Sequence, residues 1–216
     1  MALILNETEV RVLGSLVEKQ LTTPEYYPMT LNALVAACNQ KSNRDPIVSY
    51  DESTVTAALD SLRDKNLVYT FHGSTSRVVK YKHMLPNVYE LDSAAVAVMD
   101  VLMLRGPQTV GEIRGRTDRL HEFAGLSEVQ ETLDKLAHRD EPLVVKLERQ
   151  VGQKDARYAH LLSGPIELES LPAPRERTTS NASNDRIEKL EAELDSIKSE
   201  LAAIREEFAS FRKQFE

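Results

Sequence analysis

The sequence predicts a mainly α-helical protein with small β-hairpin wings, arranged as two tandem winged helix-turn-helix domains and a C-terminal coiled-coil helix. Three observations lead to this prediction. A pattern of three apolar-striped helices followed by a β-hairpin occurs twice. Two motifs recur at nearly the same interval, which indicates an internal repeat. A linker without apolar periodicity then precedes a heptad pattern that continues to the end of the sequence.

The first copy begins with a helix that Asn6 can cap, because Glu9 follows it at capping-box spacing. This helix is predicted to run to about Gln20. Further apolar stripes predict a second helix from about Thr30 and a third that begins within residues 51–53. Three helices in this order are typical of the helical part of a winged helix.

Two short β-rich runs complete each copy and predict its hairpin. In the first copy they are LVYTFH at 67–72 and RVVKYKH at 77–83, and in the second LVVKLERQ at 143–150 and RYAHLL at 157–162. The helices of the second copy are predicted at residues 92–105, 109–116 and 127–138.

Residue correspondences support the repeat. STVTAALDSL, which begins at Ser53, matches SEVQETLDKL, which begins at Ser127, at an offset of 74 residues. YKHML from Tyr81 matches YAHLL from Tyr158 at an offset of 77 residues. The predicted organisation is two winged-helix domains, a flexible linker and a coiled-coil helix, at residues 1–88, 89–163, 164–184 and 185–216.

The last segment has apolar residues at alternating steps of three and four, which is a coiled-coil pattern. A polar helix with one apolar stripe needs a partner to bury that stripe. The favoured interpretation is a homodimer, and docking on the body of the protein or on a different protein is the alternative. The predicted dimer contacts are Ile187, Leu190, Leu194, Ile197, Leu201, Ile204 and Phe208.

Composition indicates an ordinary globular protein, with 41% hydrophobic and 28% charged residues. We expect a cytoplasmic protein without a membrane segment, because no apolar run is long enough to span a bilayer and no secretory signal is evident. The net charge of -7 argues against indiscriminate binding to nucleic acid and leaves that role to local patches.

Motifs for catalysis, cofactors or metals are not evident. The single cysteine, Cys38, lies on the apolar stripe of the second helix, so we expect a buried thiol. The five histidines have no close metal-ligand spacing, and His83 and His160 occupy the same position in the two copies, which favours a packing role. The sequence therefore predicts a non-enzymatic protein without cofactor or metal.

Four runs of residues resemble the YceH-like family of bacterial proteins. They are TLNALVAACNQKSNRDP at 30–46, LMLRGPQTVGEIR at 102–114, LHEF at 120–123 and GQKDARYAHLL at 152–162. The resemblance covers residues from about 5 to 163 and implies tandem winged helices. It implies no reaction, because the family is described as uncharacterised.

Binding to double-stranded DNA is the function that the predicted fold favours, although the third helices argue against reading of base sequence. Asp60 and Asp134 occupy the same repeat position, at the centre of the face that would enter the major groove. The hairpins and inter-helix loops are locally basic and suited to phosphates. The candidate phosphate-binding residues are Lys41, Arg44, Arg77, Lys80, Lys82, Arg114, Arg116, Lys154 and Arg157.

Three alternatives stay open at this point. The acidic third helices suit a basic protein partner, so the protein could be an interaction adaptor. The basic residues could be ordinary surface charges, with Arg44 paired to a nearby carboxylate. A small-molecule sensor with a ligand between the two copies would require a pocket there.

Overall fold

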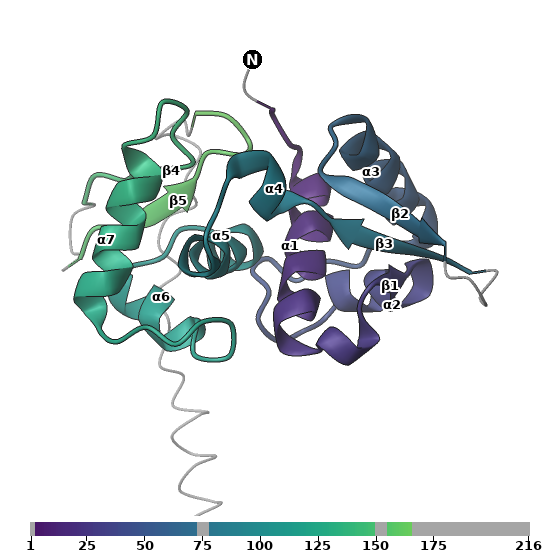
Figure 1. Cartoon of the computed structure of the whole chain (residues 1–216), viewed down its shortest axis with the longest axis horizontal. Coiled ribbons are helices and arrows are strands. Elements are labelled where there is room, and N and C mark those ends of the chain that lie inside the picture. Colours follow the sequence, from purple (N-terminus) through teal and green to yellow (C-terminus); the bar gives the residue numbers. More distant parts are fainter. Residues whose placement is uncertain (1–2, 73–77, 150–154, 166–216) are drawn as a thin grey trace, which may run out of the picture. The chain divides into compact units, whose positions relative to one another are not determined.

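The computed structural model describes residues 3–72, 78–149 and 155–165 (Figure 1). The chain divides into two compact units, Met1–Ile166 and Glu167–Glu216, and the described residues all belong to the first. The predicted coiled-coil helix and nearly all of the predicted linker lie outside the described residues. The first unit is mainly helical with two small antiparallel sheets, as the sequence predicts.

Each half of this unit contains three main helices followed by a β-hairpin. The first half has α1 (Glu7–Thr22), α2 (Leu31–Cys38), α3 (Glu52–Asp64), β2 (Val68–His72) and β3 (Val79–His83). The second half has α5 (Ser93–Arg105), α6 (Val110–Arg116), α7 (Leu126–Ala137), β4 (Val144–Lys146) and β5 (Tyr158–His160). All ten elements coincide with predicted ones, within a few residues at their ends.

Three short elements were not predicted from the sequence. They are the 3-10 turn η1 (Pro24–Tyr26), strand β1 (Met29–Thr30) and helix α4 (Leu85–Tyr89). Elements of two to five residues are too short for apolar periodicity to reveal them.

Five of the described helices, α1, α2, α3, α5 and α6, begin where a side chain accepts a hydrogen bond from a backbone N–H of the first turn. The Asn6 side chain accepts from the Glu9 N–H at 2.9 Å, and the Glu9 carboxylate accepts from the Asn6 N–H at 2.7 Å. Thr109 and Glu112 form the same reciprocal capping box at the start of α6. The predicted capping box of the first helix is therefore confirmed.

The two sheets differ in size. The first has the order β1-β3-β2, in which Met29 of β1 pairs with Tyr81 of β3. The second contains β4 and β5 alone and is extended by an isolated bridge between Gln108 and Tyr158. Its ladder is shorter than predicted, with Lys146 opposite Tyr158 as its last pair.

Helices α1 and α5 lie side by side at the centre of this unit and join its two halves (Figure 1). Every residue of α5 from Ala95 to Leu104 is buried, as is typical of a helix enclosed by protein on all sides. Buried residues from both halves form one continuous core, so the halves share their packing.

Cys38 is fully buried in this core, as predicted. Within the three described ranges, no helix is long and apolar enough to cross a membrane.

Candidate functional sites

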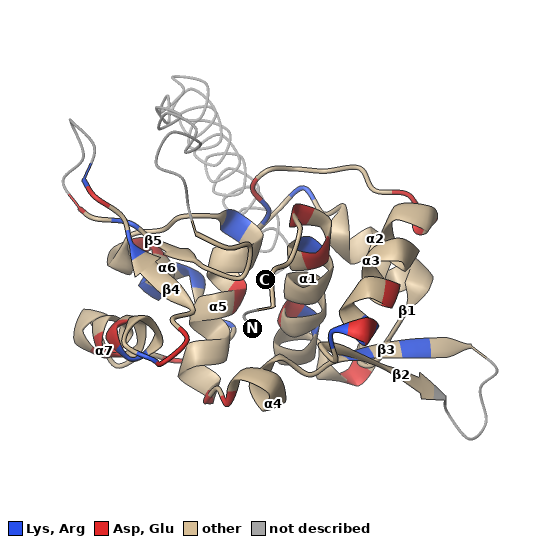
Figure 2. Cartoon of the chain, turned by 90° about the horizontal axis from the view of Figure 1, so that it is seen from above, with Lys and Arg blue, Asp and Glu red and all other residues tan. Residues whose placement is uncertain are grey.

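The outward face of the first hairpin combines aromatic and basic side chains. Tyr69 lies opposite Lys82 and Phe71 lies opposite Lys80, and residues opposite each other in an antiparallel pair share a face. Tyr69 is 59% exposed and Phe71 is 50% exposed. Lys82 is exposed, Lys80 is half-buried, and Figure 2 shows basic residues along β3. We call these four residues the hairpin face.

The other side of the same hairpin packs on the protein. Val68 and His83 are buried there, and Tyr81 contacts the core. Burial, with a smaller contribution from Lys82, lowers the pKa of His83 to about 4, so its ring is neutral at pH 7. The Tyr27 hydroxyl accepts a hydrogen bond from the His83 backbone N–H at 2.7 Å. This packing holds the hairpin face outward.

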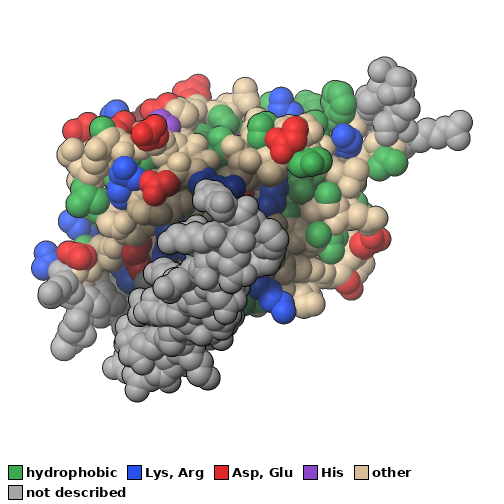
Figure 3. All heavy atoms as spheres, turned by 90° about the horizontal axis from the view of Figure 1, so that it is seen from below, with side chains coloured by type: hydrophobic (Ala, Val, Ile, Leu, Met, Phe, Trp, Pro, Cys, Tyr) green, Lys and Arg blue, Asp and Glu red, His purple; other side chains and the backbone are tan. Residues whose placement is uncertain are grey.

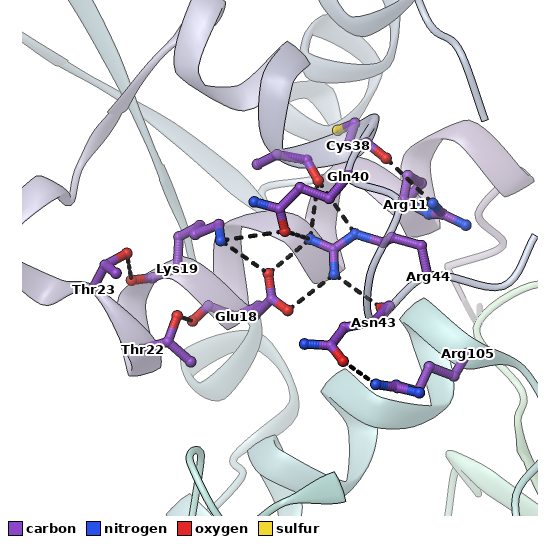
Figure 4. A network of polar contacts seen from close by, with 11 residues as sticks. Arg11, Glu18, Lys19, Thr22, Thr23, Cys38, Gln40, Asn43, Arg44 and Arg105 are labelled. Atoms are coloured by element: carbon purple, nitrogen blue, oxygen red, sulfur yellow. Dashed lines mark hydrogen bonds and ion pairs between the residues drawn. The ribbon is translucent and has the colours of Figure 1, made fainter. Parts of the chain in front are cut away.

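Arg44, a predicted phosphate contact, is instead buried beside Glu18. The Arg44 Nη2 lies 2.7 Å from Glu18 Oε2, and Nη1 lies 2.9 Å from Oε1 (Figure 4). Nε and Nη2 also donate to the Ala37 carbonyl, and the side chain is 0% exposed. Burial alone would raise the pKa of Glu18, but hydrogen bonds and charge from Arg44 outweigh it and lower that pKa.

Three other predicted contacts pair with carboxylates of the protein. Arg157 Nη1 lies 2.7 Å from Glu112 Oε2, and Arg116 Nη2 lies 3.7 Å from Glu112 Oε1. Arg114 pairs with Asp118 one turn further along the chain. A phosphate would have to compete with these carboxylates.

The remaining described contacts lie in two separate places, and only Lys41 lines the same groove as one of these arginines, Arg116. Lys80 and Lys82 lie together on β3, whereas Lys41 is exposed in the loop between α2 and α3. Arg77 and Lys154 lie outside the described residues.

A groove of about 810 Å³ opens between the two halves. It is bounded by the end of α1, the loop after α2, α5, and the segment from Gly115 to Leu120. Its basic lining residues are Lys19, Lys41, Arg105, Arg116 and Arg119. Figure 3, which views the molecule from below, shows Lys and Arg side chains gathered near the middle of this face.

Asp100 also lines this groove, although its side chain belongs to the buried helix α5. The residue is 2% exposed, and its Oδ1 has no hydrogen-bond partner in the structure. Burial and the nearby Glu18 raise the pKa of Asp100 well above its ordinary value of 3.8, against the smaller effects of nearby basic residues. The carboxyl is therefore biased toward its neutral form.

Two of the lining residues, Lys41 and Arg116, are among the phosphate contacts predicted from the sequence, but the other basic lining residues and Asp100 are not. Lys19, Asp100 and Arg119 belong to segments that no common motif or spacing connects. The pocket required for a sensor is present, but its lining is charged as well as apolar.

No group of three His, Cys, Asp or Glu side chains that could hold a metal occurs among the residues that the structure describes.

These features define a class of protein: a mainly helical body of two similar halves, with an exposed basic hairpin and a charged groove at their junction. The chain belongs to the family described as "Protein of unknown function, DUF480", which matches residues 5–153. This membership agrees with the resemblance to the YceH-like family that the sequence motifs indicate.

Similar proteins occur in several bacteria, each named only as a UPF0502 protein. The one from Opitutus terrae is 60% identical over 173 residues, which are 79% of this chain and 75% of the relative. The one from Citrifermentans bemidjiense is 55% identical over 190 residues, 88% of each chain. The one from Pelobacter propionicus is 50% identical over 200 residues, 91% of each chain.

Proposed function

We propose that this protein is a non-enzymatic, cytoplasmic tandem winged-helix protein that binds the phosphate backbone of double-stranded DNA through the hairpin face. The observation that carries the proposal is the pairing of Tyr69 with Lys82 and of Phe71 with Lys80 on one exposed side of the first hairpin. Lysines supply affinity for phosphate, and exposed aromatic side chains supply apolar contacts with sugars and base edges.

The repeated element order supports the winged-helix interpretation. In such a fold the hairpin is the wing and α3 or α7 is the helix that would lie in the major groove. Asp60 and Asp64 are exposed on α3, and Glu131 and Asp134 are exposed on α7. These carboxylates would be repelled by phosphates. We therefore assign the DNA contact to the wing, with neither helix in contact with the DNA.

Backbone contact through two lysines implies weak binding that varies little with DNA sequence. The test is fluorescence anisotropy of a labelled mixed-sequence duplex titrated with the full chain at low salt and again at rising salt. The variant Lys80→Gln/Lys82→Gln should bind at least ten-fold more weakly. The slope of log K against log salt should fall by about two units, since each phosphate contact contributes about 0.9.

A matched control removes two positive charges from the helix faces instead. Arg63 and Lys135 are exposed on α3 and α7, and Arg63 forms only a surface ion pair with Asp60. Arg63→Gln/Lys135→Gln should retain the affinity and the salt slope of the wild type. A loss of binding in this control with none in the hairpin variant would assign the contact to the helices and overturn the proposal.

A second candidate function is an adaptor that binds a basic protein surface through α3 and α7. The exposed carboxylates of both helices favour it, and Figure 2 shows acidic residues on each. The variant Asp60→Asn/Asp64→Asn separates the two functions. If the wing binds DNA, this variant should bind DNA as tightly as the wild type or more tightly. If the helices form the docking surface, the variant should no longer bind a cationic peptide such as oligolysine.

A further inference from the structure

We propose that the groove between the two halves is a binding site for a phosphate-bearing small molecule. This inference is independent of the DNA proposal, because the groove and the hairpin face have no residue in common. It depends on three observations: the charge balance of the lining, the unpartnered buried oxygen of Asp100, and the size of the groove.

The lining favours an anion. Two of its carboxylates, Glu18 and Asp118, are each paired with an arginine that is not among the lining residues, Arg44 and Arg114. Their negative charge is thereby largely compensated from outside the groove. Two basic lining residues are also paired, Arg116 with Glu112 at 3.7 Å and Lys19 with Glu18 at 3.4 Å. The five basic residues of the lining still outnumber its three acidic ones, so the groove keeps a net positive potential, which a partly enclosed low-dielectric site strengthens.

Lys41 and Arg119 are the two exposed members of this basic set, and the other three are half-buried. They come from the loop after α2 and the segment after α6, so a ligand that contacts both would bridge the two halves. Arg105 reaches across the same junction to the Asn43 side chain, which shows that the two segments approach each other closely (Figure 4).

Asp100 supplies a second, independent indication of a ligand. Buried polar atoms are nearly always hydrogen-bonded, yet the Asp100 Oδ1 has no partner in the structure. Asp100 lines the groove, so a hydroxyl, amino or phosphate group of a bound molecule can complete its hydrogen bonding. A neutral carboxyl at this position would not repel an anion, and its O–H can donate a hydrogen bond to a phosphate oxygen.

The groove has the size expected for a metabolite. Its volume of about 810 Å³ lies within the range of about 300–1,000 Å³ that is usual for small-molecule sites. A phosphate group alone would leave most of this space unfilled, so the geometry favours a larger molecule that carries phosphate at the basic rim.

Inorganic tripolyphosphate is a suitable probe because it presents the phosphate chemistry without a particular organic group. Isothermal titration calorimetry with the full chain at low salt should detect binding with a Kd below about 1 mM. Lys41→Gln/Arg119→Gln should weaken this binding at least ten-fold. Both side chains are exposed, so the fold should be retained, which thermal unfolding checks.

Two control variants locate the site. Lys135→Gln/Lys146→Gln removes two exposed charges from the second half, outside the groove, and should bind the probe as the wild type does. Lys80→Gln/Lys82→Gln should also bind tripolyphosphate as the wild type does, even though we expect it to bind DNA more weakly.

Three results of the tripolyphosphate titrations would overturn the inference. They are no heat of binding with the wild type, equal affinity in the groove variant, or a loss caused by the hairpin variant instead. Citrate provides a comparison at similar charge, because tighter binding of citrate than of tripolyphosphate would assign the groove to carboxylates and contradict the phosphate class.

Discussion

Arg44 is buried in the loop between α2 and α3, and its guanidinium attaches that loop to Glu18 of α1. Arg11 of α1 supports the same loop by donating to the Cys38 and Pro46 carbonyls. The Asn39 side chain closes the loop by exchanging two hydrogen bonds with the Tyr50 backbone, both at 2.8 Å. The contribution of these residues is thus to hold a long polar loop in one conformation.

Removing one member of the buried pair should destabilise the protein strongly, because it leaves the other charge unpaired. Breaking such a pair typically costs about 3–5 kcal/mol. Since Glu18 is 9% exposed and retains Lys19 at 3.4 Å, we expect Arg44→Met to lower the free energy of unfolding by about 3 kcal/mol. Urea denaturation followed by circular dichroism measures this change.

Lys41 lies in the same loop but is exposed, so Lys41→Met is the matched control and should change the free energy of unfolding by less than about 0.5 kcal/mol. The double variant Glu18→Gln/Arg44→Met should cost less than the sum of the two single variants, because it removes both charges together. A loss for Arg44→Met no larger than that of the control would show that the buried pair does not stabilise the loop.

At the scale of elements, the contact between α1 and α5 depends on a glycine. A Cβ at Gly14 would lie 2.9 Å from Leu104 Cδ2 and 3.0 Å from Leu104 Cγ. The absence of a side chain at this position lets the two helices approach closely. The same contact joins the cores of the two halves, so it determines their relative placement.

Gly14→Ala should therefore be destabilising although alanine favours helices. The gain in helix propensity is at most about 1 kcal/mol, whereas crowding in a packed core costs about 1–3 kcal/mol. We expect a net loss of about 1 kcal/mol in the free energy of unfolding. Gly111 of α6 provides the comparison, since a Cβ there meets nothing within 4 Å. Gly111→Ala should raise stability by up to about 1 kcal/mol, and a stabilising Gly14→Ala would contradict the close approach.

Element boundaries were predictable wherever a local signal exists. The start of α1 follows from the Asn6 and Glu9 capping box, and the β2–β3 hairpin follows from its two β-rich runs. The alternation of β3 also placed Lys80 and Lys82 on one face. Assigning Tyr69 and Phe71 to the same face requires the register in which the two strands pair. That register depends on the geometry of the turn, which the alternation of one strand does not give.

At the scale of the whole molecule, the tail is proposed to form a homodimer, and its residues lie outside the described part of the chain. Sedimentation velocity of the full chain at micromolar concentration should give twice the mass of one chain. Ile197→Lys/Leu201→Lys places two charges in the predicted seam and should yield monomers. The monomeric variant should also bind DNA more weakly than the wild type, because a dimer can present two hairpin faces to one duplex.

The control for this prediction is Ser196→Lys, which lies in the same segment but outside the apolar seam and should leave the dimer intact. A monomeric wild type, or a seam variant that remains dimeric, would contradict the predicted coiled coil.

The sequence by itself determined the main helices, the strands of the two hairpins and their repetition, because caps and apolar periods are set by residues that are neighbours in the chain. Only the tertiary structure decided which charges are available for binding. Arg44 and Glu18 are 26 residues apart. Asp100 and Arg119 line the same groove as Lys19 because α5 packs against α1 and α6 packs against α5. The burial and pairing of a charge depend on residues that folding brings together from distant parts of the chain. The local sequence around a charged residue does not show which distant residues will lie beside it.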